Sequence, residues 1–186
     1  HLQHDVYGNI VLGAAQAFHD HRLLHRAGAA ELAQLEAVGE QAIRVYGQPD
    51  AGMWELRTRA RVHTSSALMS WAACDRLAKI ATVLGNTARA DYWAAHAEHM
   101  RTEIIAKSWS EERQAFPESF GGRDLDASVL LMAEVGFIDP RDPRFIATVE
   151  AMEKSLCDGP YMRRYEAPDD FGKPETAFNI CTFWRI

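Results

Sequence analysis

Hydrophobic residues recur every three to four positions along most of the chain, which is the spacing of the buried face of an α-helix. Polar residues fill the positions between them. The segments that show this pattern are 6–26, 32–45, 64–85, 88–108, 125–132, 145–152 and 175–184. No segment alternates convincingly as a strand does, and only 161–165 is expected to pair locally. The pattern therefore predicts an all-α protein.

Turn and capping residues separate the predicted helices. Gly28 ends the first, and the run 47–50, Gly-Gln-Pro-Asp, ends the second. Thr64 and Ser65 open the third, because their hydroxyl oxygens can accept a hydrogen bond from an unpaired N–H of the first turn. These signals support helices joined as consecutive hairpins.

Connections between the helices alternate between short and long. The segments 26–31, 85–87 and 135–143 read as short turns, whereas 47–63, 107–123 and 156–174 are long. In a chain of antiparallel hairpins every second connection lies at the same end, so the long loops are expected to share one face. Long structured loops between helices are often functional.

The long loops also carry aromatic residues that solubility does not require, namely Trp54, Trp109, Phe116, Phe120, Tyr161, Tyr165 and Phe171. Two architectures fit this organisation. One is an α/α toroid with an active site at the mouth that the long loops form. The other is an α-solenoid or irregular bundle with decorated loops.

The composition and net charge of the chain argue against some classes of binding partner. The 186 residues have 47% hydrophobic and 25% charged residues and a net charge of -6, as in a globular domain with a sizeable core. An acidic chain without a basic run argues against nucleic acid and favours a neutral substrate. Since no apolar run approaches the roughly 20 residues that cross a membrane, no membrane partner is expected.

The cysteine and histidine residues predict neither a disulfide framework nor a metal site. Cys74, Cys157 and Cys181 form no CxxC pair, so we expect three small buried side chains and a reducing, cytoplasmic location. Among the histidines, those at 19, 21 and 25 are expected on a polar helix face, and no metal site is predicted. The chain starts at His1, within a helical pattern, so we expect it to be cut at both ends; upstream targeting signals remain open.

The segment 48–57, Gln-Pro-Asp-Ala-Gly-Met-Trp-Glu-Leu-Arg, carries the candidate chemistry. Pro49 and Gly52 predict a turn that places Trp54 and Glu55 at the end of a loop. A carboxyl group beside a large indole is partly desolvated, which suits a general acid, and an indole offers a face for a sugar ring. In the competing interpretation, Trp54 packs in the core and Glu55 pairs with Arg57 or Arg59.

Residues 52–57 resemble the general-acid motif of glycoside hydrolase family 15, whose bacterial members carry a Gly-Ile-Trp-Glu-x-Arg-like string. Further motifs resemble the family in the same order, so that the resemblance covers essentially the whole chain. They are Asp-Val-Tyr-Gly at 5–8, His-Thr-Ser-Ser at 63–66, Trp-Ala-Ala-Cys-Asp-Arg at 71–76, Leu-Asp-Ala-Ser at 125–128, Val-Gly-Phe at 135–137 with Asp-Pro at 142–143, Arg-Tyr at 164–165, Gly-Lys-Pro-Glu at 172–175 and Cys-Thr-Phe-Trp at 181–184.

The resemblance implies part of an (α/α)6 toroid, with residues 1–186 as one segment of the catalytic domain. It implies that Glu55 is the general acid of an inverting hydrolase, that Trp54 walls the sugar subsite and that Arg164 binds sugar hydroxyls. The other substrate-binding candidates that follow from it are Arg57, His63, Tyr165 and Asp169. His63 has an equally plausible role in packing the loop, and the alignment around Asp169 and Asp170 is loose, so a solvated acidic turn is an alternative there.

Other parts of the family's machinery have no match here. The catalytic base and an upstream Arg-Asp pair are expected outside the chain, so the chain alone is not expected to be active. No cofactor is expected. Relatives often carry a Lys shortly after the Ser that corresponds to Ser66, but Ala67 follows it here, a departure that bears on substrate preference.

The predicted function is an exo-acting, glucoamylase-type hydrolase of α-glucosidic bonds, with an oligosaccharide or a small molecule as substrate. A trehalase of the same family is the first alternative. The others are a non-catalytic helical carbohydrate-binding module and an isomerase or lyase on the same toroid, for which His63 alone is thin support. Exposed apolar helix faces predict self-association.

Overall fold

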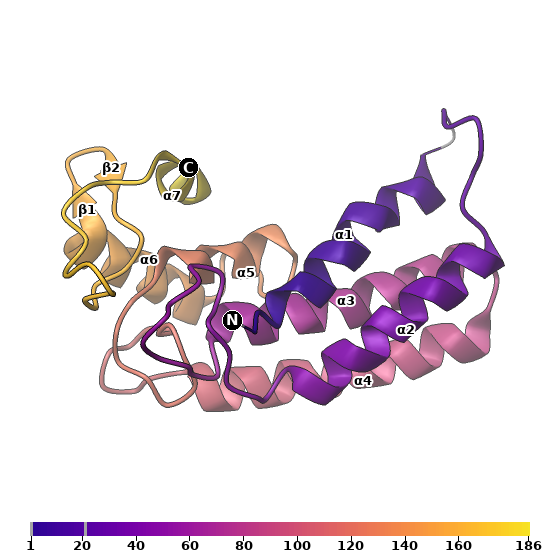
Figure 1. The fold of residues 1–186 in the computed structure, drawn as a ribbon, viewed down its shortest axis with the longest axis horizontal. Coiled ribbons are helices and arrows are strands. Elements are labelled where there is room, and N and C mark those ends of the chain that lie inside the picture. The colour runs from indigo at the N-terminus through magenta and orange to yellow at the C-terminus, as the bar shows by residue number, and fades with distance from the viewer. Residues whose placement is uncertain (1, 21) are drawn as a thin grey trace.

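The computed structural model describes residues 2–20 and 22–186, and the described chain is predominantly helical (Figure 1). The expectations for His1 and His21 lie outside these residues. The elements are α1 (Asp5–His19), α2 (Ala29–Val45), α3 (Thr64–Val83), α4 (Thr87–Ser108), the 3-10 helix η1 (Ala127–Leu130), α5 (Leu131–Glu134), α6 (Pro143–Leu156), β1 (Cys157–Asp158), β2 (Tyr161–Met162) and α7 (Asn179–Arg185). The predicted all-α class is confirmed. The local pairing expected near residue 161 is a short antiparallel hairpin in which β1 and β2 contribute two residues each.

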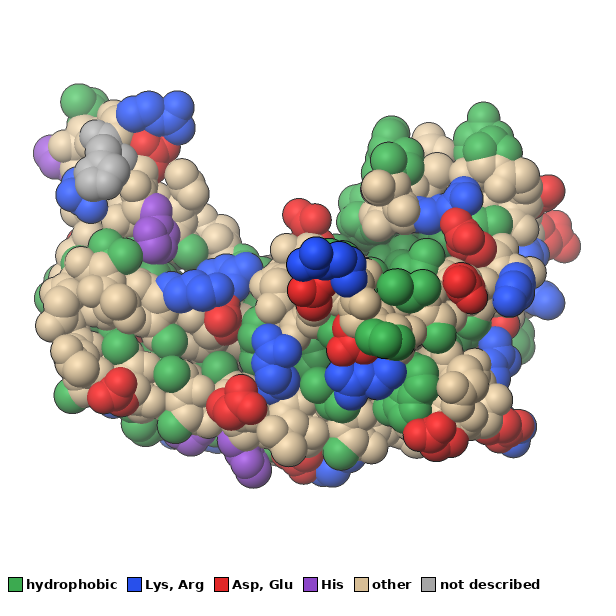
Figure 2. All heavy atoms as spheres, turned by 180° about the vertical axis from the view of Figure 1, so that it is seen from behind, with side chains coloured by type: hydrophobic (Ala, Val, Ile, Leu, Met, Phe, Trp, Pro, Cys, Tyr) green, Lys and Arg blue, Asp and Glu red, His purple; other side chains and the backbone are tan. Residues whose placement is uncertain are grey.

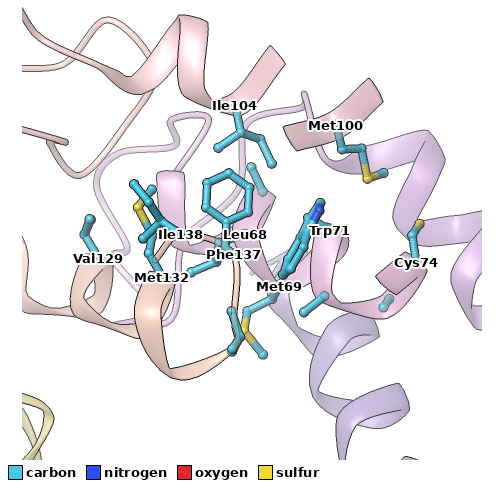
Figure 3. Packing of buried hydrophobic residues seen from close by; sticks show 14 of the residues in the cluster. Leu68, Met69, Trp71, Cys74, Met100, Ile104, Val129, Met132, Phe137 and Ile138 are labelled. Atoms are coloured by element: carbon cyan, nitrogen blue, oxygen red, sulfur yellow. The ribbon is translucent and has the colours of Figure 1, made fainter. Parts of the chain in front are cut away.

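Helix α3 lies at the centre of the helical array, with α1, α2 and α4 packed around it. Its first half is buried on every side, which explains why its sequence is apolar or small almost throughout. Trp71 of α3 meets Phe137 edge to face at 4.9 Å between ring centroids, and Ile104 of α4 completes this part of the core (Figure 3).

Two glycines allow α1 and α2 to approach the central helix closely. A Cβ on Gly8 of α1 would lie 2.1 Å from the carbonyl oxygen of Met69 in α3. A Cβ on Gly39 of α2 would lie 2.3 Å from Cδ1 of Leu77. A larger residue at Gly8 would therefore push α1 away from the α3 backbone, and one at Gly39 would displace the side chains of Leu77 and Trp93.

Several predicted helix boundaries are wrong at the N-terminal side of the fold. The first helix ends at His19 instead of residue 26, because the carboxylate of Asp20 accepts from the N–H of Arg22 at 2.9 Å and diverts the backbone. Leu24 beyond it is exposed and has no core to pack against. At the start of α3 the N-cap is His63, and the Thr64 hydroxyl donates to the Pro117 carbonyl instead of capping the helix.

Two further helices are shorter than predicted, because backbone N–H and C=O groups near their expected starts form hydrogen bonds with distant segments of the chain. The helix predicted at 125–132 begins only at Ala127, since Ala127 N–H donates to the Arg164 carbonyl and Leu125 accepts from Glu166 N–H. The last helix begins at Asn179 instead of residue 175, and Phe178 N–H donates to the Met162 carbonyl. Backbone groups that are committed to such pairing cannot also join a helical ladder.

The long loops meet at one end of the array, as predicted (Figure 1). Loop 47–63 pairs with loop 107–123 through a bridge between His63 and Ser119, and Phe120 N–H donates to the Val62 carbonyl at 3.0 Å. A second bridge, between Asp126 and Tyr165, joins the segment just after that loop to loop 156–174. The helices thus form a rigid support for three interconnected loops.

The surface carries mixed charges, and hydrophobic side chains gather at the end that holds α7 (Figure 2). Phe183 there is 70% exposed. Self-association through such a face stays a prediction. Among the described residues no helix is long and apolar enough to cross a membrane. Cys74 and Cys181 are buried as expected, whereas Cys157 is only half-buried.

The glycines of α1 provide a matched test of the close packing. Gly8→Ala is expected to lower the free energy of unfolding by about 1–3 kcal/mol, because the methyl group meets the α3 backbone. Gly13 lies on the exposed face with no neighbour within 4 Å, so Gly13→Ala should raise stability by about 0.5–1 kcal/mol through helix propensity. Urea unfolding measures both, and equal shifts of the midpoint in the two variants would contradict the packing.

Candidate active site

The segment that carries Glu55 is a loop closed at its base. Asp50 and Arg61 exchange backbone hydrogen bonds of 2.9 and 3.2 Å, and residues 51–60 project from this pair. Within the projection, Glu55 N–H donates to the Gly52 carbonyl at 3.1 Å. Gly52 has a φ of 66°, which glycine adopts readily, but Glu55 has a φ of 55°. Such a conformation is strained for a residue with a side chain and is often found at functional sites.

The carboxylate of Asp50 fastens the base of this loop to two helices. It is buried and accepts hydrogen bonds from the backbone N–H of His4 at 2.8 Å, from Nδ1 of His63 at 2.9 Å and from the hydroxyl of Ser66 at 2.7 Å. Burial alone would raise the pKa of the Asp50 carboxyl, but these hydrogen bonds outweigh burial and lower the pKa.

The indole of Trp54 is fixed from behind by Asp126. Its Nε1–H lies 3.0 and 2.8 Å from the two oxygens of that carboxylate, which is 4% exposed and also accepts from the N–H of Ser128. Burial raises the pKa of the Asp126 carboxyl despite these hydrogen bonds, because desolvation of the charge is the larger effect.

Arg164 lies over the same indole. Its guanidinium carbon is 5.7 Å from the centroid of Trp54 and 5.2 Å from that of Tyr165, distances at which a cation is attracted to an aromatic face. The side chain is 38% exposed, so its N–H groups remain accessible to a ligand. A planar guanidinium suits adjacent sugar hydroxyls.

Loop 156–174 carries two aspartates beside the Glu55 turn, and one of them, Asp170, binds that turn directly. The Tyr165 hydroxyl donates to Asp169 at 2.6 Å, which lowers the pKa of the Asp169 carboxyl; burial and this bond raise the pKa of Tyr165. Asp170 accepts from the N–H of Arg57 at 3.0 Å and from the hydroxyl of Thr58 at 2.5 Å, and these bonds lower its pKa. Hydrogen bonds to Asp170 therefore connect the two loops just after Glu55.

A pocket of about 150 Å³ lies between these groups. Its lining residues are Trp54, Glu55, Leu56, Arg57, Arg164, Tyr165, Asp169, Asp170 and Phe171. Larger hollows of about 340 and 570 Å³ occur elsewhere but contain none of the predicted site residues. This volume is below the roughly 300 Å³ of common ligand pockets.

The structure brings together six of the seven site residues that the sequence predicts. The exception is His63, which is buried and absent from the pocket lining; it contacts Asp50, and its ring packs against Gly52. This placement favours the packing role that was its alternative. Its contact with Asp50 nevertheless connects His63 to the base of the loop that presents Glu55.

Glu55 itself is exposed, so the expected desolvation by Trp54 is absent from this structure. Among the described residues its carboxyl has no hydrogen bond or ion pair, and the alternative pairing with Arg57 or Arg59 is not present. Arg59 instead lies 4.0 Å from the buried Glu118. The Glu55 carboxyl is thus free to face a ligand in the pocket.

Sequence reasoning missed the roles of Asp50 and Asp126. Both residues belong to motifs named in the sequence analysis. Their roles, however, depend on hydrogen-bond partners that lie 13 to 72 residues away in the sequence. In the part of the chain that the structure describes, no group of three or more His, Cys, Asp or Glu side chains is placed to hold a metal ion. What the pocket offers is an unpaired carboxyl, a cation, acceptor carboxylates and aromatic faces.

Comparison with known proteins matches this arrangement to one family. The family described as glycosyl hydrolases family 15 matches residues 1–186. A trehalase of Mycobacterium tuberculosis is 33% identical over 192 residues, covering 99% of this chain and 27% of the trehalase. A trehalase of Thermoplasma volcanium is 31% identical over 190 residues, covering 100% of this chain and 29% of that protein.

Solved structures match the fold. A glycosidase in complex with glucose superposes with a TM-score of 0.78 at 18% identity, over 99% of this chain and 47% of that chain. The wild-type glycosidase gives the same values. The likeness identifies the helical hairpins as those of an α/α toroid and excludes the solenoid alternative. The chain spans less than a third of the length of the two trehalases and about half of the glycosidase.

The left-handed backbone at Glu55 predicts a stability difference between two substitutions that both remove the carboxyl. Glu55→Gly should be more stable than Glu55→Ala by about 1 kcal/mol, because only glycine adopts this φ without strain. Chemical denaturation of both variants tests this. At an ordinary exposed helix position such as Glu150, the order should reverse, with Ala the more stable.

The lowered pKa of Asp50 predicts a pH-dependent contribution to stability. Its folded pKa lies below the unfolded value near 3.9, so the folded state binds fewer protons and the contribution is complete above about pH 4. It is lost as pH falls through the folded pKa. Asp50→Asn should therefore lower the free energy of unfolding by about 2 kcal/mol at pH 7, and the difference from the wild type should shrink below pH 4.

The control for Asp50 is Asp158→Asn, which removes an exposed carboxyl at the surface of β1. It should change stability little at any pH. Unfolding curves between pH 7 and pH 3 measure both variants. A constant difference between wild type and Asp50→Asn across this range would show that the carboxylate is not what the surrounding donors stabilise.

Proposed function

The chain belongs to glycosyl hydrolase family 15, and on that premise we propose that the protein hydrolyses α-glucosidic bonds with Glu55 as the general acid. The observation that carries the proposal is the placement of Glu55. Its unpaired carboxyl stands on a strained turn at the edge of a pocket that holds Arg164 and two aromatic rings. Residues 1–186 would then form part of one catalytic domain.

Trehalose is the substrate that we propose first. The similar proteins from Mycobacterium tuberculosis and Thermoplasma volcanium are both named trehalases. The sequence motifs alone favour a maltooligosaccharide over trehalose as the substrate. A glucoamylase-type enzyme remains the second candidate, because the pocket's polar groups suit any terminal glucosyl ring. The small pocket volume supports a single ring at this position.

In the proposed reaction Glu55 donates its proton to the glycosidic oxygen as the C1–O bond breaks. A water molecule attacks C1 from the opposite face, so that the configuration at C1 inverts. The guanidinium of Arg164 donates to ring hydroxyls, and Asp169 and Asp170 lie where they can accept from them. The general base that takes the water proton is not assigned to a described residue.

Replacement of the acid tests the proposal. In the full-length protein, Glu55→Gln should lower kcat on trehalose by about 10²- to 10⁴-fold, since an amide cannot donate the proton of a carboxylic acid. The exposed Glu150 on α6 gives the matched control, and Glu150→Gln should retain wild-type turnover. Near-normal activity of Glu55→Gln would refute the assignment.

The stereochemistry gives an independent test. Inverting hydrolysis of trehalose yields one β-glucose from the attacked ring and one α-glucose from the departing ring, and proton NMR distinguishes them before they equilibrate. Two α-glucose molecules would show a retaining mechanism. Glucose release from maltose, maltotriose or soluble starch, but not from trehalose, would favour the glucoamylase alternative. Sugar binding without release from any of the four would favour a non-catalytic module.

A further inference from the structure

The buried carboxylate of Asp126 has no part in the proposed reaction as described. We propose that Asp126 is a positioning residue: it fixes the indole of Trp54 and, through it, the turn that presents Glu55 for proton transfer. The proposal rests on the proposed function, because it concerns the geometry of the same acid.

The first support is the directionality of the contact. The single N–H donor of Trp54 points between the two oxygens of the carboxylate, at 3.0 and 2.8 Å. A charge-assisted hydrogen bond to both oxygens fixes the position and the tilt of the ring. The indole also meets the rings of Tyr165, Phe178 and Trp184, with centroids 6.0–6.2 Å away, and the guanidinium of Arg164; these contacts restrict its orientation less.

The second support is the short covalent path from the indole to the acid. Trp54 immediately precedes Glu55, and consecutive Cα atoms are only about 3.8 Å apart. The turn is tight and strained at Glu55, so it has little freedom to absorb a displacement of its neighbour. A shift of the indole would therefore move the carboxyl relative to a bound glycosidic oxygen.

The third support is the link to the sugar-binding side. The Ala127 N–H donates to the Arg164 carbonyl at 2.8 Å, next to the bridge between Asp126 and Tyr165. The guanidinium of Arg164 lies over the indole that Asp126 holds. The carboxylate thus lies where the turn that carries Glu55 and the part of loop 156–174 that carries Arg164 are both anchored.

An amide cannot replace this carboxylate. One oxygen of Asp126 accepts from Ser128 N–H and from the indole, the other accepts from the indole, and the Ser128 side chain also hydrogen-bonds the carboxylate. In Asp126→Asn, the amide NH₂ meets either the indole N–H or the Ser128 N–H, so one donor faces another. The substitution is nearly isosteric and removes a buried charge, and the fold is expected to survive it.

The experiment compares Asp126→Asn, Trp54→Phe, the double variant and Glu55→Gln in the full-length protein, on trehalose and on α-glucosyl fluoride. Fluoride leaves with little need of a proton, whereas the sugar leaving group of trehalose requires the acid. Asp126→Asn should lower kcat/KM on trehalose by ~10- to 100-fold, the scale of a small misplacement of a catalytic group, and should largely retain fluoride hydrolysis. Asp124→Asn, nearby and partly exposed, is the control and should behave as wild type.

Trp54→Phe removes the indole donor, so adding Asp126→Asn to it should cost less than threefold more, as expected for two residues that act through one contact. Equal losses on both substrates, or full additivity of the two substitutions, would overturn the positioning role while Glu55→Gln stays inactive on trehalose. If Glu55→Gln instead hydrolyses trehalose normally, the proposed function fails, and the positioning role fails with it.

Discussion

The end of the helical array at which the site forms depends on the buried carboxylate of Asp50. A carboxylate out of water costs several kcal/mol unless its oxygens are satisfied, and the donors that satisfy it come from the start of α1, from His63 and from the first turn of α3. The same residue closes the Glu55 loop with its backbone. Two helices and a loop are thereby fixed by one group, which allows a strained conformation at Glu55 to persist.

The pKa values of the two buried aspartates of the site shift in opposite directions once burial and hydrogen bonds are both included. Asp50 receives three donors, one of them from an imidazole, and its pKa falls. Asp126 is buried too, and although it accepts from the backbone N–H and side chain of Ser128 and from the Trp54 indole, desolvation keeps its pKa raised. Its charge is therefore a net cost to folding at neutral pH. Natural proteins tolerate such local costs chiefly where function requires them.

The sequence predicted the helices well where one face meets the core and the other meets water, as in α2, α4 and α6. Prediction failed where long-range contacts override local preference: Leu125 and Phe178 are committed to backbone pairing with loop 156–174 and cannot start a helix. The motif around Glu55 singled out the proposed acid, because its residue types are themselves the signal. The partners of Trp54 and Asp50 lie elsewhere in the chain, and no local pattern reveals them.

The pocket is assembled almost entirely from contacts between loops that the helices hold in place. Asp170 binds the backbone of Arg57 across 113 residues, and Asp126 binds Trp54 across 72. A sugar ring seated between Glu55 and Arg164 would touch both loops at once. In the proposed reaction its binding energy would then tighten the junction between them and orient the proposed acid most firmly as the glycosidic bond breaks. Rigid helices with function in the connecting loops are the arrangement that permits this.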